Sequence, residues 1–296
     1  MGNSKRQLLM ALMTLVLLAG CGLEEAPDAA RYQQPDALFA QVMSNVNDSN
    51  DLQVILEIDH SRLGAEAGSA MPPARVLIFS NPRLEAQLIK QNPLAAIDLP
   101  LRILAFESQP EGLARVIYNN FDYIESRYSP GAPADLRTMY DDTIAQALED
   151  IPANQIAAFT NNKMQPDGIT TIDSPFDFAT TVEKVLAGID AQDDTVRFDS
   201  VDFQQVAREV GIKIAPTTLL LFGGPAPGAK AMSNAPTLGL DAFCQKFLVW
   251  QDADGNVHLS FNNLLAIAER QDVGKSIPLR VINYRLSSVF EDVLNP

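Results

Sequence analysis

Residues 73–106, PARVLIFSNPRLEAQLIKQNPLAAIDLPLRILAF, decide the fold because they contain two apolar segments with a proline-initiated segment between them. Arg75–Phe79 and Leu101–Phe106 are short and apolar, which predicts strands. Pro82 stands where the intervening helix would begin, a position that needs no backbone N–H. The stretch therefore predicts a strand, a helix and a second strand.

The same stretch recurs as residues 216–250, PTTLLLFGGPAPGAKAMSNAPTLGLDAFCQKFLVW. Most equivalent residues are separated by 143 positions, and a slip of one residue places Phe106 opposite Trp250. The pairs include Pro73 and Pro216, Phe79 and Phe222, Asp98 and Asp241, Asn119 and Asn262, and Arg127 and Arg270. A fixed offset over this length indicates an internal duplication. We expect a first repeat domain at 36–152, a linker at 153–167 and a second repeat domain at 168–296.

Helix and strand patterns alternate in the rest of each copy. Asp36–Val46 and Phe176–Ile189 have apolar residues at helical spacing, whereas Gln53–Ile58 alternates like a strand. A short helix is predicted at Ser61–Ala67, ending at Gly68. The remaining predictions are hairpin turns at Gln109–Gly112 and Asp252–Gly255, and closing helices at Leu136–Asp150 and Leu279–Val293.

The N-terminus has the features of an exported bacterial lipoprotein. Lys5 and Arg6 precede an apolar run of twelve residues, Leu8–Ala19, which is too short to span a bilayer. The sequence Leu18-Ala19-Gly20-Cys21 resembles a lipobox, in which the cysteine is acylated after cleavage. We therefore predict a lipoprotein signal peptide at 1–20, lipidation at Cys21 and an acidic tether at 21–35. An ordinary signal peptide with an incidental cysteine is the alternative.

Several acyl chains, such as palmitate, on Cys21 would anchor the protein durably. Gly22 follows the cysteine, and the absence of an aspartate there favours the outer membrane over inner-membrane retention. The predicted location is therefore the periplasmic face of the outer membrane, with the lipid as the membrane contact.

The composition excludes several classes of function. A formal net charge of −15 argues against a nucleic-acid partner, because few basic residues are left to neutralise phosphates. Two cysteines and two histidines leave little material for a disulfide framework or a metal centre, and we expect no metal. The sequence also lacks a nucleotide-binding loop and a nucleophile elbow, so we expect no cofactor and no catalytic residue.

The repeated residues resemble the family known as domain of unknown function 302. The resemblance rests on Ile58-Asp59-His60, Pro73, Leu77–Pro82, Asn92-Pro93 and Ile97–Leu101, and on their counterparts in the second copy. The second copy departs from the pattern where Phe203 replaces the histidine. The resemblance implies an α+β fold: two tandem two-layer α/β sandwich domains, each a small, mostly antiparallel sheet covered by helices. It implies no activity, and it makes pairing between the two domains plausible.

Asp59 and His60 are the first candidates for a functional site. A histidine beside carboxylates could act as a base or metal ligand, with Glu57, Glu66 and Asp98 as neighbours. The structural alternative is that Asp59 caps the following helix. The second copy keeps the aspartate but has Phe203 at the position equivalent to His60, which favours this alternative. Ligand contact by Asp59 and His60 in the first copy stays open.

Asn81 and Asp98 are weaker candidates for ligand contact. Asn81 precedes a predicted helix, whose free N–H groups could hold an anion, but a structural turn explains it equally well. Asp98 and Asp241 recur in a loop that enters a strand, which favours a turn or capping role. Cys244 replaces Leu101 in the repeat register and is expected to be a small buried residue.

The leading functional hypothesis is an envelope lipoprotein that acts as a non-catalytic ligand-binding or assembly module. This hypothesis is favoured over an enzyme because the sequence contains no recognisable set of catalytic residues. Two alternatives remain: a small-molecule or metal-dependent enzyme using Asp59 and His60, and a structural scaffold for envelope partners. In each case we expect the first and second domains to pair with each other.

Overall fold

The computed structural model describes residues 27–109, 113–129, 131–161 and 168–295. The predicted signal peptide, Cys21, the beginning of the tether, most of the Gln109–Gly112 turn and part of the linker lie outside these residues. None of the helices in the described ranges has the length and apolar character needed to cross a membrane.

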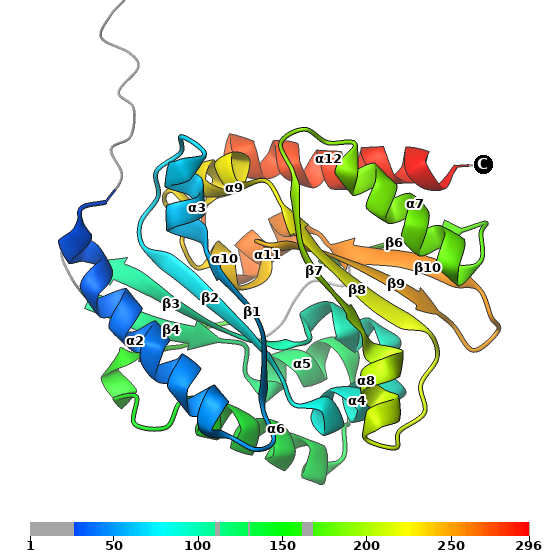
Figure 1. Ribbon diagram of the computed structural model, residues 1–296, viewed down its shortest axis with the longest axis horizontal. Helices are drawn as coiled ribbons and strands as arrows, with labels where there is room; N and C mark the ends of the chain where they lie inside the picture. Colours follow the sequence, from blue (N-terminus) through cyan, green and yellow to red (C-terminus); the bar gives the residue numbers. More distant parts are fainter. Residues whose placement is uncertain (1–26, 110–112, 130, 162–167, 296) are drawn as a thin grey trace, which may run out of the picture.

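The first copy runs from helix α2 to strand β5 (Figure 1). Its elements are α2 (Ala29–Asp48), β1 (Gln53–Asp59), α3 (His60–Glu66), β2 (Ala74–Ser80), α4 (Pro82–Gln91), the 3₁₀ helix η1 (Pro93–Asp98), β3 (Leu101–Gln109), β4 (Leu113–Tyr118), α5 (Phe121–Tyr128), α6 (Ala134–Ala147), the 3₁₀ helix η2 (Ala153–Gln155) and β5 (Ile156–Ala157).

The second copy repeats this order with local changes. Its elements are β6 (Ile169–Ser174), α7 (Phe178–Asp190), β7 (Val196–Asp202), α8 (Phe203–Glu209), β8 (Thr217–Gly223), α9 (Pro225–Met232), α10 (Leu238–Asp241), β9 (Gln245–Gln251), β10 (Val257–Asn262), α11 (Leu264–Arg270) and α12 (Ile277–Leu294).

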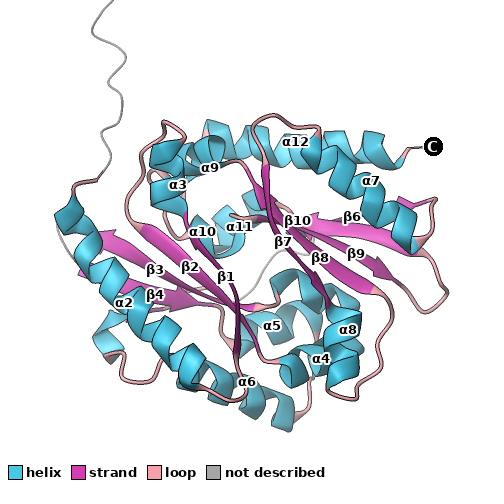
Figure 2. Cartoon of the chain, viewed as in Figure 1, coloured by secondary structure: helices cyan, strands magenta, loops and turns pink. Residues whose placement is uncertain are grey.

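Each copy forms one sheet, and the described residues give each sheet five strands. The orders are β1-β2-β3-β4-β5 and β6-β10-β9-β8-β7, so β1 to β4 pair in the same order as β7 to β10. All pairings are antiparallel except that of β5 with β4. Helix α2 crosses the first sheet, and α7 and α12 lie along the second (Figure 2). The predicted fold class of two tandem α+β domains is confirmed.

Local sequence explains where the repeated helices begin and end. Pro82 and Pro225 occupy the first turn of α4 and α9, as predicted. Gly68 and Gly211 follow α3 and α8 with φ of 77° and 74°, a left-handed conformation that favours glycine. These residues give both copies the same chain reversals between the first two strands of the repeat.

Two predicted boundaries are wrong. Helix α2 begins at Ala29 and contains Pro35, so residues 29–35 are helical instead of forming a tether. Arg31 in this helix forms an ion pair with Glu107, which fixes its first turn to the sheet. The predicted linker also begins too early, because η2 and β5 lie within 153–167 and β5 extends the first sheet. Long-range pairing, which local composition does not reveal, decides both boundaries.

Short helices join the two copies. Helix α3 of the first copy packs against α9 of the second, and α4 of the first packs against α8 of the second. Helix η1 contacts β8, β9 and β10, while α10 contacts β2 and β3. The contacts therefore come in equivalent pairs. In each copy the segment before the third strand of the repeat, η1 before β3 and α10 before β9, packs against the sheet of the other copy.

Candidate functional site

Asp59 and Asp202 end equivalent strands and start equivalent helices. The Asp59 carboxylate accepts a hydrogen bond from the Arg62 backbone N–H at 2.9 Å, and Asp202 accepts one from Gln205 N–H at 3.0 Å. Asp59 also accepts from the Ser61 hydroxyl and pairs with the Arg62 guanidinium. The capping prediction is confirmed, and its recurrence in both copies marks it as a property of the fold.

His60 lies at the contact between the copies. Its side chain is buried, and its Nε2 is 3.0 Å from the carbonyl oxygen of Gly239 in α10. Burial lowers the pKa of His60 to about 4, although the Gly239 hydrogen bond opposes this shift. The imidazole is therefore neutral near pH 7 and donates to Gly239 through Nε2.

An acidic pocket around His60, with Glu57, Glu66 and Asp98 as possible neighbours, was one alternative from the sequence. Glu57 forms an ion pair with Arg75, and Asp98 forms one with Arg127. Within the described ranges, no group of three or more His, Cys, Asp or Glu side chains could hold a metal ion. The described contacts therefore do not support that alternative.

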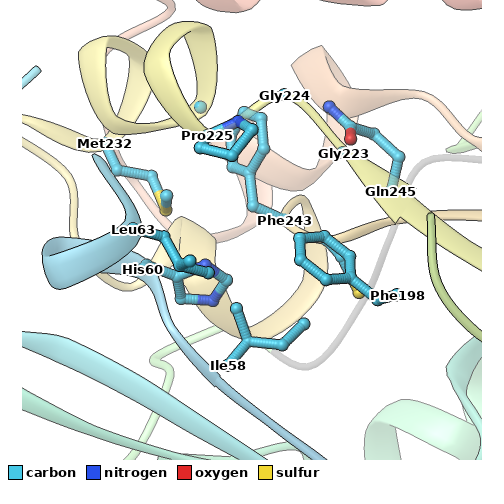
Figure 3. Close-up of a pocket in the computed structure, with 12 residues that line it drawn as sticks. Ile58, His60, Leu63, Phe198, Gly223, Gly224, Pro225, Met232, Phe243 and Gln245 are labelled. Atoms are coloured by element: carbon cyan, nitrogen blue, oxygen red, sulfur yellow. The ribbon is translucent and has the colours of Figure 1, made fainter. Parts of the chain in front are cut away.

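A small pocket adjoins His60 (Figure 3). Its cavity volume of about 20 Å³ admits one water-sized molecule. Both copies line it, and the residues that bear on its chemistry are His60, Cys244 and Gln245, with Phe198 and Phe243 among the apolar walls. The Oε1 atom of Gln245 is buried without a hydrogen-bond partner in the described structure. The pocket is mostly apolar and lies between the copies.

The equivalent position on the other side of the contact has different residues. Phe203 stands where the first copy has His60, and its side chain is fully buried. Glu85 stands in α4 where α9 has Gly228, and the Ser80 hydroxyl donates to it at 2.7 Å. Burial raises the pKa of Glu85 to about 8, against the effect of Ser80. The two related sites are therefore chemically different.

Asn81 serves the structure of the first copy. Its side-chain oxygen accepts from the Leu84 backbone N–H at 3.2 Å, which caps α4. Its Nδ2 donates to the Thr143 hydroxyl at 2.9 Å. The structural interpretation of Asn81 is confirmed, because its side chain caps α4 and joins it to α6.

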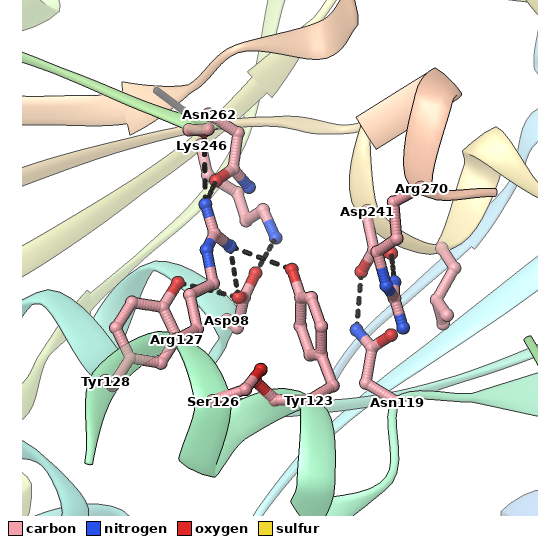
Figure 4. A network of polar contacts seen from close by, with 12 residues as sticks. Asp98, Asn119, Tyr123, Ser126, Arg127, Tyr128, Asp241, Lys246, Asn262 and Arg270 are labelled. Atoms are coloured by element: carbon pink, nitrogen blue, oxygen red, sulfur yellow. Dashed lines mark hydrogen bonds and ion pairs between the residues drawn. The ribbon is translucent and has the colours of Figure 1, made fainter. Parts of the chain in front are cut away.

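Asp98 is the centre of a buried polar network that joins the copies (Figure 4). It accepts from Lys246 Nζ at 3.2 Å and from the Tyr128 hydroxyl at 2.7 Å, and it pairs with Arg127. Arg127 in turn donates to Asn262 of the second copy. The turn or capping role predicted for Asp98 is wrong, because its carboxylate neutralises cations from both copies.

Asp241 forms the related centre in the second copy. It accepts from Asn119 Nδ2 at 2.7 Å, Arg270 Nη1 at 3.1 Å and Gln271 Nε2 at 3.1 Å. The Arg270 guanidinium also lies over the Tyr123 ring, 3.7 Å from its centroid. A capping role is wrong here too. Asn119 crosses between copies just as Asn262 does, so the contact is approximately two-fold.

The charged groups of this network shift one another's pKa values. Burial alone would raise the pKa of Asp98, but Arg127 and Lys246 outweigh it and hold that pKa well below its usual range. Burial and the Arg102 charge lower the pKa of Lys246 to about 8, although Asp98 opposes them. Asp98 is therefore ionised and unsuited to general acid–base chemistry near neutral pH.

Cys244 is buried, and burial raises the pKa of its thiol. This agrees with the predicted small buried residue. A thiol is a nucleophile only as thiolate, so this environment disfavours covalent chemistry.

The cations that surround the two aspartates were not predicted from the sequence. Arg127, Lys246 and Arg270 received no role, nor did Asn119. A signal was present, because Asp98, Asn119 and Arg127 all recur at the same offset. Recurrence of an acid, an amide and a base together favours a shared contact over three independent turns.

The chain is similar to three curated relatives over a limited part of their length. It is 35% identical over 109 residues to fluoride-specific ion channel FluC 1 of Brucella suis biovar 1 (strain 1330), which covers 37% of this chain and 42% of the relative. The same identity and length are found with FluC 1 of Brucella abortus biovar 1 (strain 9-941), covering 37% and 40%. The chain thus spans about two fifths of the length of these relatives.

A solved structure and a family description complete the comparison. A crystal structure of an uncharacterized conserved protein DUF302 from Bacillus stearothermophilus has 16% sequence identity and a TM-score of 0.36, covering 43% of this chain and 95% of that one. The family model for domain of unknown function DUF302 matches residues 30–151 and again residues 170–292. The chain therefore belongs to the DUF302 family and contains two tandem copies of its domain.

Proposed function

We propose that this protein is a non-catalytic binding module of the bacterial cell envelope, anchored by lipid on Cys21, whose two domains pair and hold a small ligand between them. One observation carries the proposal: the polar residues of a potential site are occupied by structural contacts. Asp59 and Asn81 cap helices, Asp98 is neutralised by cations, and His60 is neutral.

The pocket beside His60 supports a ligand between the domains. It lies where the copies meet, and at the equivalent position the second copy has the buried Phe203 instead of a histidine. A pocket between domains is a common place for a small ligand. The Brucella relatives are named as fluoride-specific ion channels, and a small anion is a ligand class that agrees with a pocket of this size.

A ligand screen on the full chain tests the proposal. We expect a ligand to raise the melting temperature saturably, because binding to the native state alone stabilises it. His60→Phe, which copies the second domain, should reduce this effect by filling the pocket. Arg137→Met, at an exposed ion pair, is the control. Substrate turnover that disappears with His60→Ala would refute the non-catalytic proposal and favour the enzyme alternative.

A further inference from the structure

The outward face of α12 carries an apolar stripe that is exposed to solvent. Ile277, Val281 and Tyr284 follow one another at helical spacing, so they lie on one side of the helix. Their exposed fractions are 78%, 52% and 72%, whereas Ile282 and Leu286 on the opposite side are buried. Five large apolar side chains of the described residues are exposed, and three of them form this stripe. Helix α12 lies along the upper edge of the molecule in Figure 1, where its outer side is open to a partner.

The equivalent helix of the first copy has no such stripe. At the offset of 143 residues, the exposed positions of α6 hold small or polar residues: Ala134, Thr138 and Asp141. Such residues suit a helix that faces water. The stripe is therefore a feature of the second copy and is not required by the repeated fold.

The charged residues on the same face of α12 are separated by sign. Arg280 lies in the first turn, Glu291 and Asp292 lie in the last turn, and all three are exposed. None of them forms an ion pair with another residue of the described chain, whereas Arg285, at the side of this face, pairs with Asp194. The helix dipole favours the reverse order, with acidic residues at the N-terminal end and basic residues at the C-terminal end. The three unpaired charges therefore do not stabilise their own helix.

A second copy of α12 in the antiparallel direction complements this face. With a two-fold axis at the level of residue 286, Arg280 of each copy faces Asp292 of the other, and Tyr284 faces the small Ser288. A two-fold contact forms each of these pairs twice. The antiparallel arrangement also places the N-terminal end of each helix beside the C-terminal end of the other, so the two dipoles attract each other.

An anionic membrane matches only part of the face. The apolar stripe and Arg280 suit a lipid surface, but Glu291 and Asp292 lie on the same face and would be repelled by anionic headgroups. A second copy provides an opposite charge for both ends of the helix. The charge pattern therefore favours self-association.

We propose that α12 forms an antiparallel, two-fold contact with α12 of a second copy of this chain, with Tyr284 near the axis and Arg280 paired with Asp292 at both ends. One helix face is smaller than a standard interface, so we expect a weak dimer with a Kd of about 10–100 μM. The contact does not involve the pocket between the domains, and a chain that stays monomeric would leave the proposed ligand binding unaffected.

Sedimentation equilibrium of the full chain in density-matched detergent tests the proposal, at concentrations below and above the expected Kd. Arg280→Asp and Asp292→Arg each place like charges opposite each other, so each should weaken self-association about a hundredfold. Tyr284→Ser removes the central ring and should weaken it about tenfold. The control is Arg83→Asp, the same charge change in the exposed first turn of α4, which should associate like the wild type. A wild type that stays monomeric above the expected Kd, or unchanged association in both charge variants, would overturn the inference.

A mixture of the two charge variants tests the pairing itself. In a mixed dimer, the Arg280→Asp copy presents two aspartates and the Asp292→Arg copy presents two arginines, so both contacts regain opposite charges. The mixture should associate with nearly wild-type affinity, and so should the chain that carries both substitutions. If the wild type dimerises but neither of these samples associates, the antiparallel assignment is wrong.

Thermal unfolding separates loss of the contact from loss of the fold. Both charge variants agree better with the dipole of α12, so their Tm in dilute solution should equal or exceed that of the wild type. If a variant has a lower Tm, the mixed sample decides, because a damaged helix would not regain association on mixing. Restored association in that sample supports the proposal, and its absence refutes it.

Discussion

Asp98 and Lys246 are 148 residues apart in the chain, yet the Asp98 Oδ1 accepts a hydrogen bond from the Lys246 Nζ at 3.2 Å. Asp98 ends η1 of the first copy and Lys246 belongs to β9 of the second. Both side chains are buried, so separating the copies would leave an aspartate and a lysine without each other. The pair ties the stability of each domain to the presence of the other.

Asp98→Asn should lower the free energy of unfolding by about 3–5 kcal/mol, because it leaves Arg127 and Lys246 buried without their carboxylate. Urea unfolding of the full chain measures this loss. The control is Asp122→Asn, which removes a partner of Arg137 at the surface and should change stability by about 1 kcal/mol or less. Equal effects of the two substitutions would show that the buried network does not stabilise the pairing.

Gly64→Ala should destabilise the contact between α3 and α9. A Cβ atom at Gly64 would lie 2.4 Å from the Ala229 Cβ and 2.8 Å from the Ser69 carbonyl oxygen. Because backbone restrains both neighbours, we expect a loss of about 1–3 kcal/mol in unfolding experiments. Gly274→Ala, where the new Cβ meets nothing within 4 Å, is the matched control and should be near neutral. A neutral Gly64→Ala would mean that the helices are farther apart.

Glu85→Gln should remove a pH-dependent loss of stability. The folded-state pKa of Glu85 is raised to about 8, so its contribution is complete below the unfolded pKa near 4.5 and declines as pH rises toward 8. Between pH 5 and 7.5 the stability of the wild type relative to Glu85→Gln should fall by about 3 kcal/mol. Denaturant unfolding at the two pH values measures the difference. Glu149→Gln, on the exposed surface, should behave like the wild type in this comparison.

His60→Gln should change the opposite end of the pH profile. The folded-state pKa of His60 is lowered to about 4, so the unfolded chain takes up a proton first as pH falls below about 6.5. The stability of the wild type relative to His60→Gln should therefore fall by about 2 kcal/mol between pH 7 and 4.5. His60→Gln keeps a donor toward Gly239 without titrating, and His60→Phe copies the second domain. An undiminished acid sensitivity in both variants would place the titrating group elsewhere.

Cys21→Ser should release the protein from the membrane. The lipobox resemblance predicts acylation at Cys21, and without acyl chains we expect the acidic chain to have no attraction to anionic headgroups. Metabolic labelling with palmitate and membrane fractionation measure the change. Incorporation of label into Cys21→Ser, or unchanged membrane association, would contradict lipidation at this position.

Local residues were sufficient to predict several of the repeated elements of the fold, but not the equivalent helices α5 and α11. Pro82 and Pro225 begin helices and Gly68 ends one because dihedral limits act within a few residues. Asp59 caps α3 for the same reason. The predicted start of α2 was wrong, because a contact with a distant residue decides it. Arg31 in the first turn of α2 pairs with Glu107, which is 76 residues away.

The duplication followed from a constant offset in the sequence. The succession of helices and strands along each copy also followed from it, because dihedral preferences and apolar periodicity act over short distances. Only the tertiary structure decided two features of the contact between the copies. These are the partners of Asp98 and Asp241, and the difference between the His60 and Phe203 sites. A buried charge is defined by which distant groups surround it, and packing of one copy against the other brings those groups together. Local sequence therefore specified each domain, whereas packing between the domains decided the chemistry of their contact.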